Sequence, residues 1–236
     1  MGKPDRSLFR GYWNLDEASG DAIDSTANGN TLTETSGTIA SAEGGRDFEL
    51  GDTEYFTRAD NASLSFADEA FTIGAWVKLE SQTFTRVILS KWDWGLNKRE
   101  YLLWYDDTDD RYEFRISGNG TENIGVLANN YGAVPATTKA FVIAWHDPVA
   151  NKIYIQVDNG VVDELAHTTG CNDNTTAFAL GTYFNSGAQN SNLDGIEWSA
   201  FVYAGLMTAD ERTWMYNSGT PRKWSEIYFV PRAGMI

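Results

Sequence analysis

The sequence predicts an all-β fold: a two-sheet antiparallel jelly-roll sandwich with one short C-terminal helix. Apolar residues alternate with mixed ones in four runs, at residues 71–77, 111–117, 153–157 and 198–203. This period of two is typical of half-buried strands. Turn residues separate the runs, as in the acidic stretch 106–110 and the Asp-Asn-Gly stretch 158–160. Because almost no helical periodicity intervenes, we expect antiparallel sheets rather than alternating strand–helix units.

The one convincing helix follows the last predicted strand. Thr208 precedes Glu211 by three residues, which is the spacing of a capping box. Asn217 and Gly219 are expected to end the helix. Trp214 and Met215 are expected to face the sandwich. Residues 18–46 are rich in Gly, Ser, Thr and Asn, and predict a long loop that carries one or two short strands.

Composition limits the possible partners. The 236 residues fit a single β-sandwich domain, with 33 acidic and 18 basic residues and a formal charge of −15. Such an acidic surface repels phosphate backbones, so we expect no nucleic-acid partner. No apolar run is long enough to insert into a membrane, and the first ten residues lack the apolar core of a secretory signal. The chain is therefore either a mature form or a protein that reaches a virion or extracellular surface by assembly or lysis.

Four motifs resemble one family in order and spacing. They are GYWNLDEASG at 11–20, FTIGAWVK at 71–78, IYIQVDNG at 153–160 and the closing segment from DG at 194–195 to YNSG at 216–219. Together they resemble a laminin-G-like domain of the concanavalin A-like lectin/glucanase superfamily over residues 8–219. The resemblance implies a jelly roll of two curved sheets and leaves residues 220–236 as an extension. Trp198 and Ser199 stand where the family commonly has an acidic pair, so no role of that pair is expected here.

Catalysis has little support in the sequence. A glycosidase needs two carboxylates about 5–9.5 Å apart, and hydrolases of this superfamily often carry E-x-D-x-E on one strand. No such run is present. Glu113 lies between Arg111 and Arg115 and is expected on an ion-paired solvent face. We therefore predict a non-catalytic module, with a glycoside hydrolase or lyase as the weakest alternative.

Calcium is the cofactor that the resemblance suggests. Relatives often hold a structural Ca²⁺ between the opening loop and the closing strand, and the matching residues here are Asp24 and Asp194, with Asn28 or Asn30 adding a carbonyl. Oxygen ligands on a flexible loop suit this ion. The alternative is that Asp24 and Asn28 are turn residues that cap their own backbone.

Exposed aromatic residues are the candidates for ligand binding. Trp92 and Trp94 flank Asp93 and are followed by Asn97 in a turn, so these four residues form a predicted glycan site. The alternative is a purely structural segment.

The extension is basic and aromatic in an otherwise acidic chain. Trp224, Tyr228, Phe229 and Arg232 are candidates for a subunit interface. The alternative is that the segment folds back over its own sandwich. The leading hypothesis is a binding or assembly module, such as a surface component of a virion (a phage head or fibre protein) or another homo-oligomer. A carbohydrate-binding lectin module is the second hypothesis.

Overall fold

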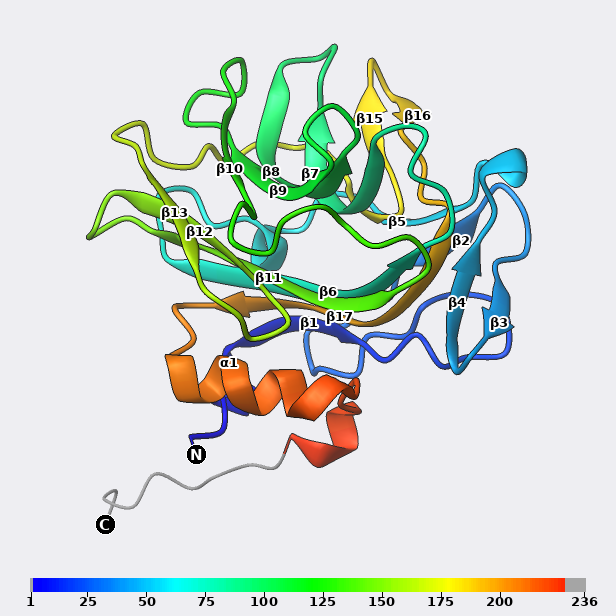
Figure 1. Ribbon diagram of the computed structural model, residues 1–236. Coiled ribbons are helices and arrows are strands. Elements are labelled where there is room, and N and C mark those ends of the chain that lie inside the picture. Colours follow the sequence, from blue (N-terminus) through cyan, green and yellow to red (C-terminus); the bar gives the residue numbers. More distant parts are fainter. Residues whose placement is uncertain (1, 228–236) are drawn as a thin grey trace.

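The computed structural model describes residues 2–227 and confirms a sandwich of two antiparallel sheets (Figure 1). The first sheet contains β1 (Phe9–Trp13), β3 (Ala40–Ala42), β4 (Gly45–Phe48), β6 (Phe71–Leu79), β11 (Lys139–Asp147), β12 (Lys152–Val157), β13 (Asp163–Ala166) and β17 (Gly195–Ala204). The second contains β2 (Thr33–Thr35), β5 (Tyr55–Arg58), β7 (Arg86–Asp93), β8 (Lys98–Asp106), β9 (Arg111–Ile116), β10 (Ile124–Leu127), β14 (Phe178–Leu180), β15 (Tyr183–Asn185) and β16 (Ala188–Asn190).

The order of the strands shows the jelly-roll crossovers. The first sheet runs β13-β12-β11-β6-β17-β4-β3, with β1 also on β17. The second runs β10-β9-β8-β7-β14-β5-β2, with the β15–β16 hairpin beside β7. All of these pairings are antiparallel except a single parallel bridge between β15 and β7.

Helices are short and lie outside the sheets. The α-helix is α1 (Ala209–Tyr216), and the 3₁₀ turns are η1 (Arg6–Leu8), η2 (Leu50–Asp52), η3 (Ala62–Leu64), η4 (Asn217–Gly219) and η5 (Trp224–Glu226). The predicted capping box is confirmed: the Thr208 hydroxyl accepts from the Glu211 amide, and the Glu211 carboxylate accepts from the Thr208 amide at 2.7 Å. No helix among residues 2–227 has the length and apolar character needed to cross a bilayer.

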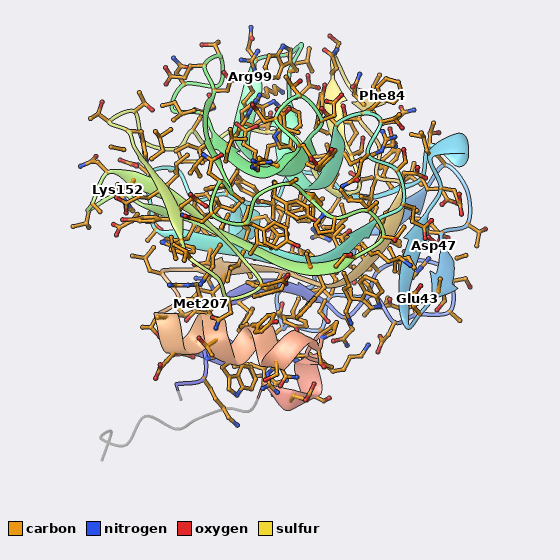
Figure 2. The ribbon with its side chains drawn as sticks, in the orientation of Figure 1. Glu43, Asp47, Phe84, Arg99, Lys152 and Met207 are labelled. Carbon is orange, nitrogen blue, oxygen red and sulfur yellow. The ribbon has the colours of Figure 1, made fainter. Side chains whose placement is uncertain are left out.

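Both faces of the first sheet are covered. In β6, Phe71, Ile73 and Val77 enter the core between the sheets, whereas Trp76 packs in a second apolar cluster on the α1 side. Trp214 of α1 belongs to that second cluster, as the sequence predicted. Figure 1 shows α1 against this sheet, and Figure 2 shows side chains filling the space between the layers. Double coverage explains why β6 is buried along nearly its whole length.

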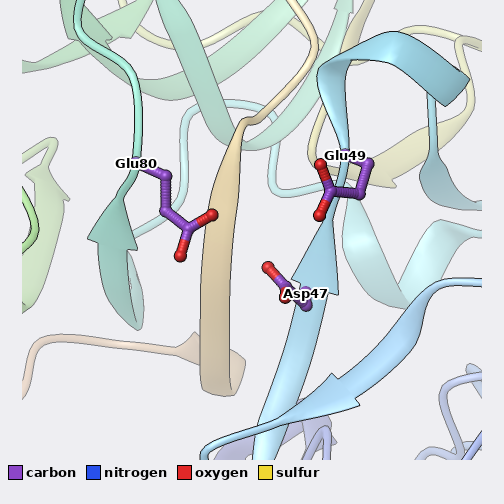
Figure 3. A group of neighbouring side chains, drawn as sticks. All are labelled: Asp47, Glu49 and Glu80. Carbon is purple, nitrogen blue, oxygen red and sulfur yellow. The ribbon is translucent and has the colours of Figure 1, made fainter.

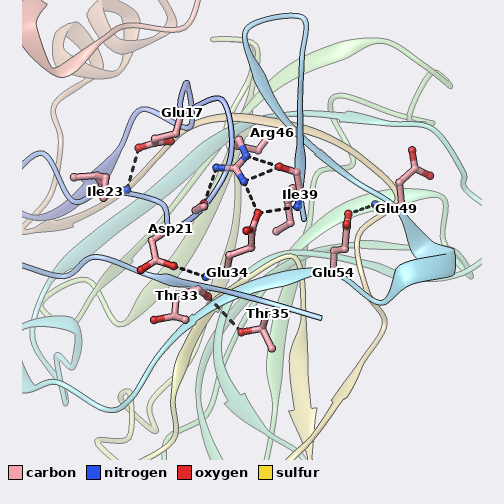
Figure 4. A network of polar contacts seen from close by, with 11 residues as sticks. Glu17, Asp21, Ile23, Thr33, Glu34, Thr35, Ile39, Arg46, Glu49 and Glu54 are labelled. Carbon is pink, nitrogen blue, oxygen red and sulfur yellow. Dashed lines mark hydrogen bonds and ion pairs between the residues drawn. The ribbon is translucent and has the colours of Figure 1, made fainter. Parts of the chain in front are cut away.

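The long segment 18–46 is fastened to the body by one buried arginine. The Arg46 guanidinium donates to the carbonyl oxygens of Gly20 and Ile39 and forms a 2.6 Å ion pair with Glu34 (Figure 4). Asp21 accepts from the Glu34 amide in the same network. As predicted, this segment carries short strands, β2 and β3, and the network holds its loops to the sandwich.

The extension beyond residue 219 lies against the body as far as it is described. Ile227 is fully buried, and the Trp224 ring contacts those of Phe9 and Tyr12, with ring centroids 5.6 and 5.4 Å away. The Tyr12 hydroxyl donates to the Arg222 carbonyl at 2.6 Å. Residues 220–227 are therefore part of the folded unit. The other residues predicted to contact a partner lie outside the described residues: Tyr228, Phe229 and Arg232.

One carboxyl group lies in the core without a partner. Ile196 and Trp198 of β17 face the α1 side, so Glu197 between them points into the space between the sheets. Glu197 is fully buried, and neither of its carboxylate oxygens has a hydrogen-bond partner within residues 2–227. Burial raises its pKa well above the ordinary value for glutamate.

Candidate functional site

The predicted ligand-binding residues lie at the tip of the β7–β8 hairpin, but their side chains differ in exposure. Trp92 is fully buried and packs with Val87, Leu102 and Trp104. It offers no ring to a ligand, so its predicted exposure is wrong. Trp94 is 37% exposed and Leu96 is 53% exposed. The surface of this tip is therefore formed by Trp94 and Leu96, with Trp92 as support beneath.

Asp93 fastens the tip to the neighbouring hairpin. It is 2% exposed, and its carboxylate accepts from the amides of Leu96, Ser186 and Gly187 at 2.8–2.9 Å. The bond from Leu96 closes the β7–β8 tip itself, and the bonds from Ser186 and Gly187 join the tip to the β15–β16 turn. Asn97 adopts a left-handed conformation, φ 56°, which closes the turn. Asp93 and Asn97 thus position the tip.

Arg99 fixes the Trp94 ring. The guanidinium lies 4.1 Å from the centre of that ring and donates to the carbonyl oxygens of Trp94 and Thr121. Burial lowers the pKa of Arg99. One face of the indole is thus covered, and the rest of its exposed surface is held in a fixed orientation.

A pocket of about 210 Å³ opens beside the tip. Its walls include Leu96, Lys98, Phe184, Thr175 and Thr176. Lys98 donates to the Thr175 hydroxyl at 2.8 Å. The pocket therefore combines apolar side chains with hydroxyl groups, which is the mixed lining typical of small-molecule sites.

A buried ion pair supports the loop that forms the polar wall. Lys91 lies 3.0 Å from Glu100, with both side chains fully buried, and donates to the Asn174 carbonyl at 2.7 Å. Glu100 accepts from the Asn174 amide at 2.8 Å. The effect of burial on the pKa of Glu100 exceeds the opposing effect of the Lys91 charge, and it raises that pKa to about 7. Lys91 and Glu100 therefore anchor the backbone of the loop that carries Thr175 and Thr176, through its residue Asn174.

The predicted calcium ligands are not brought together. Asp24 is 8% exposed, and its carboxylate accepts from the amides of Tyr12, Thr26 and Asn30 and from the Thr26 hydroxyl. The backbone of Asp24 forms a β-bridge with Trp13, and Trp13 lies opposite Ala200 in β17. Asp194 instead directly precedes Gly195, the first residue of β17. The distance along the strand from Gly195 to Ala200 is roughly 16 Å, which separates Asp194 from Asp24.

The opening loop therefore fits the alternative reading, in which Asp24 and Asn28 serve their own turn. Asn28 donates through its side-chain amide to the Phe9 carbonyl at 2.9 Å and to the Thr26 hydroxyl at 3.1 Å. These residues do not fit a shared ion with Asp194.

A different group of acids gathers on the first sheet. One oxygen from each of Asp47, Glu49 and Glu80 lies within 4.8 Å of the others (Figure 3). Burial and the two glutamates raise the pKa of Asp47. Oxygen atoms at this spacing suit Ca²⁺. No sequence signal predicts the group, because pairing of β4 and β6 with opposite sides of β17 brings together acids that are distant in sequence.

Glu113, which the sequence places on a solvent face, is instead buried. Glu113 is 5% exposed and accepts from Trp104 Nε1 at 2.7 Å and from Arg115 Nε at 2.8 Å. The predicted pairing with Arg115 is thus confirmed. Arg111 instead donates to the carbonyl oxygens of Asp109 and Asp110. Burial raises the pKa of Glu113.

The two histidines lie side by side although they are distant in sequence. Their ring centroids, in His146 of β11 and His167 after β13, are 5.0 Å apart. Both side chains are buried, and burial lowers both pKa values. The rings are therefore neutral at pH 7 and carry charge only in more acidic solution.

Two solved structures with a similar fold are the binding domains of toxins. The binding domain of Paraclostridial Mosquitocidal Protein 1 superposes with a TM-score of 0.68 at 12% identity, covering 90% of this chain and 52% of that one. The botulinum neurotoxin serotype C1 binding domain superposes with a TM-score of 0.67 at 13% identity, covering 90% of this chain and 52% of that one. The chain thus spans about half the length of these toxin domains.

A third neighbour matches along nearly its full length. Domain 4 of AbnA, a GH43 extracellular arabinanase from Geobacillus stearothermophilus, in complex with arabinotriose, gives a TM-score of 0.55 at 14% identity, covering 88% of this chain and 98% of that one. No curated protein sequence matches. A family model described as concanavalin A-like lectin/glucanases superfamily matches residues 50–211. The chain therefore belongs to the concanavalin A-like lectin/glucanase superfamily.

Proposed function

We propose that this protein is a non-catalytic, glycan-binding module that recognises its ligand at the tip of the β7–β8 hairpin. The observation that carries the proposal is the half-exposed, fixed Trp94 ring next to an apolar and hydroxyl-lined pocket. Aromatic surface and a few fixed polar groups are what bind the apolar face and the hydroxyls of a sugar.

The solved neighbours support a binding role. One is a complex with arabinotriose, and another describes the entry of botulinum neurotoxin type C as dependent on two ganglioside molecules. A third is a neurotoxin binding domain in complex with synaptotagmin II, a protein. Glycan recognition is preferred here because the pocket is small and hydroxyl-lined rather than broad and apolar.

A glycan array and a thermal-shift assay test the proposal together. Trp94→Ala is expected to lose glycan retention without loss of the fold, because the ring is partly exposed. Phe84→Ala is the matched control, since Phe84 is 64% exposed on the loop before β7, apart from Arg99 of the tip (Figure 2). Equal retention by wild type and Trp94→Ala, or binding to no glycan at all, would refute the proposal.

The second candidate is an assembly role, as a component of a virion or other extracellular surface. It is supported by the aromatic and basic composition of residues 228–236, which include Tyr228, Phe229 and Arg232. Native mass spectrometry would compare the full chain with a chain ending at Ile227, which keeps the buried contacts of the extension. Assembly predicts an oligomer that the shorter chain fails to form, whereas identical monomeric masses would exclude it.

A further inference from the structure

A second, larger pocket is lined by residues of the amino-terminal segment, of the loop at 25–28 and of the extension. Figure 1 shows the amino terminus and the end of the described extension on the α1 side of the first sheet, opposite the β7–β8 tip. The pocket volume is about 540 Å³, within the range of small-molecule sites. The amino-terminal segment, the opening loop and the extension each contribute to its wall, through Arg6, Asn28 and Trp224 respectively. Trp224 of the extension thus completes a wall that residues 6–9 and 25–28 form otherwise.

The charge of this pocket is opposite to that of the chain. The protein carries a formal charge of −15, yet no acidic residue is among the described residues that line the pocket. Arg6 is the charged lining residue, and its guanidinium makes no hydrogen bond or ion pair with any residue from 2 to 227. An unpaired arginine at a cavity in so acidic a protein is a ready partner for an anion.

The arginine is held in a defined orientation. Its guanidinium carbon lies 4.2 Å from the centre of the Trp224 ring. Trp224 is itself fixed, because its amide donates to the Asn14 side chain at 2.9 Å and its ring lies edge-on to Phe9. This contact with the ring uses none of the guanidinium N–H groups as hydrogen-bond donors to a carboxylate, which can accept two of them in parallel.

The rest of the wall offers neutral polar groups on a rigid loop. The four hydrogen bonds to Asp24 hold the loop in place. Both bonds of the Asn28 side chain use its amide nitrogen, so its oxygen is available to accept from a ligand hydroxyl. The Ser25 hydroxyl accepts from Asn14 at 3.3 Å and has its own proton to donate. A preformed wall of this kind lowers the ordering cost of binding.

We propose that this pocket binds a saccharide that bears a carboxylate. The Arg6 guanidinium pairs with the carboxylate, while Asn28 and Ser25 hydrogen-bond to ring hydroxyls. The saccharide part rests on the proposed glycan-binding function, whereas the preference for an anion rests on Arg6 and on the acid-free wall alone. The site is separate from Trp94, which lies on the other side of the sandwich.

NMR titrations of the protein measure its affinity for two probes, methyl β-D-glucuronide and methyl β-D-glucoside. The glucuronide carries a carboxylate and the glucoside does not. The glucuronide is expected to bind at least about tenfold more tightly, since a charge-assisted bidentate contact is lost with the glucoside. Arg6→Gln should weaken glucuronide binding by about the same factor. Arg10→Gln, which removes the same charge from a neighbouring residue outside the pocket wall, should leave it within about twofold.

A second pair of variants avoids the Arg6–Trp224 contact. Ala27 is an exposed residue of the pocket wall, so Ala27→Glu adds a repelling carboxylate and Ala27→Gln adds a neutral side chain of the same shape. Ala27→Glu should weaken glucuronide binding several-fold more than Ala27→Gln. Equal affinity for the two probes, equal effects of the Arg6 and Arg10 variants, or no shifts at residues 6, 25–28 and 224 would overturn the proposal.

The two proposals fail separately. Trp94→Ala should leave glucuronide binding in this pocket unchanged. If Trp94→Ala abolishes glycan retention while the glucuronide shifts no residue of the pocket, the acidic-saccharide site is wrong and the hairpin site stands. If the glucuronide binds as described while Trp94→Ala retains every array glycan, the hairpin site is wrong.

Discussion

Replacing Glu197 with methionine should stabilise the protein strongly, and by an amount that depends on pH. The buried carboxyl has no hydrogen-bond partner within the described part of the chain, and burial raises its pKa well above the ordinary value, so folding favours its neutral, protonated form. An unfolded glutamate has a pKa of about 4.3 and ionises at pH 7. Between pH 4.3 and the raised pKa of the folded state, folding must therefore take up a proton, which costs about 1.4 kcal/mol for each pH unit in that interval.

The direction of the pH effect follows from which state binds the proton. The folded state holds it and the unfolded state releases it, so this residue makes stability fall as pH rises from about 4.3 towards the folded pKa. Glu197→Met removes the titration with a side chain of similar length. Its gain over the wild type should therefore grow as pH rises from 5 to 7, by up to about 1.4 kcal/mol for each pH unit.

Urea denaturation at several pH values from 5 to 7 measures the difference between the two proteins, in which the titration of other groups largely cancels. Glu122→Met is the matched control: Glu122 lies in a loop and forms no ion pair with any described residue. Its effect should stay within about 0.5 kcal/mol. A Glu197→Met gain that is constant over this range, or a net loss of stability, would refute the reasoning.

Four further outcomes are expected. Thr208→Ala breaks the capping box and should lower the free energy of unfolding by about 1 kcal/mol in the same assay. Asp47→Asn removes one of three mutually repelling carboxyls, so it should raise the melting temperature at pH 7. Ca²⁺ should raise the wild-type melting temperature, EDTA should reverse that rise, and Asp47→Asn should show a smaller response; no response in the wild type would exclude the ion there. Burial lowers the pKa of His146 and His167, so each opposes folding as pH falls below about 6.5. His167→Leu should therefore lose less stability than the wild type between pH 7 and 5.5, and equal losses would contradict this.

The architecture was readable from the sequence because it depends on local patterns. Alternation placed β6, β9, β12 and β17, and the capping spacing placed α1. Periodicity cannot report what covers each face, however. It did not show that the outer face of β6 is sealed by α1, nor that Glu113 is buried beneath neighbouring side chains.

The sites were harder to predict because they depend on contacts between distant segments. Trp92 and Trp94 look equivalent in the sequence, yet only Trp94 keeps an exposed ring in the folded tip. Asp24 has the chemistry of a metal ligand, but its carboxylate accepts hydrogen bonds from three backbone amides instead. The pocket at Arg6 takes part of its wall from Trp224 of the extension, which no spacing rule foresees.

The anchoring of the β7–β8 tip from below has a consequence for how the surface of the tip can vary among related proteins. Asp93 and Lys91 fix the backbone through bonds to main-chain groups, and such bonds do not depend on which side chains the bonded residues carry. Substitutions at Leu96, Thr175 or Thr176 would therefore change the chemistry offered to a ligand while the frame beneath stays the same. In this fold, the residues that set the backbone shape of the tip are therefore different from the residues that set the chemistry of its surface.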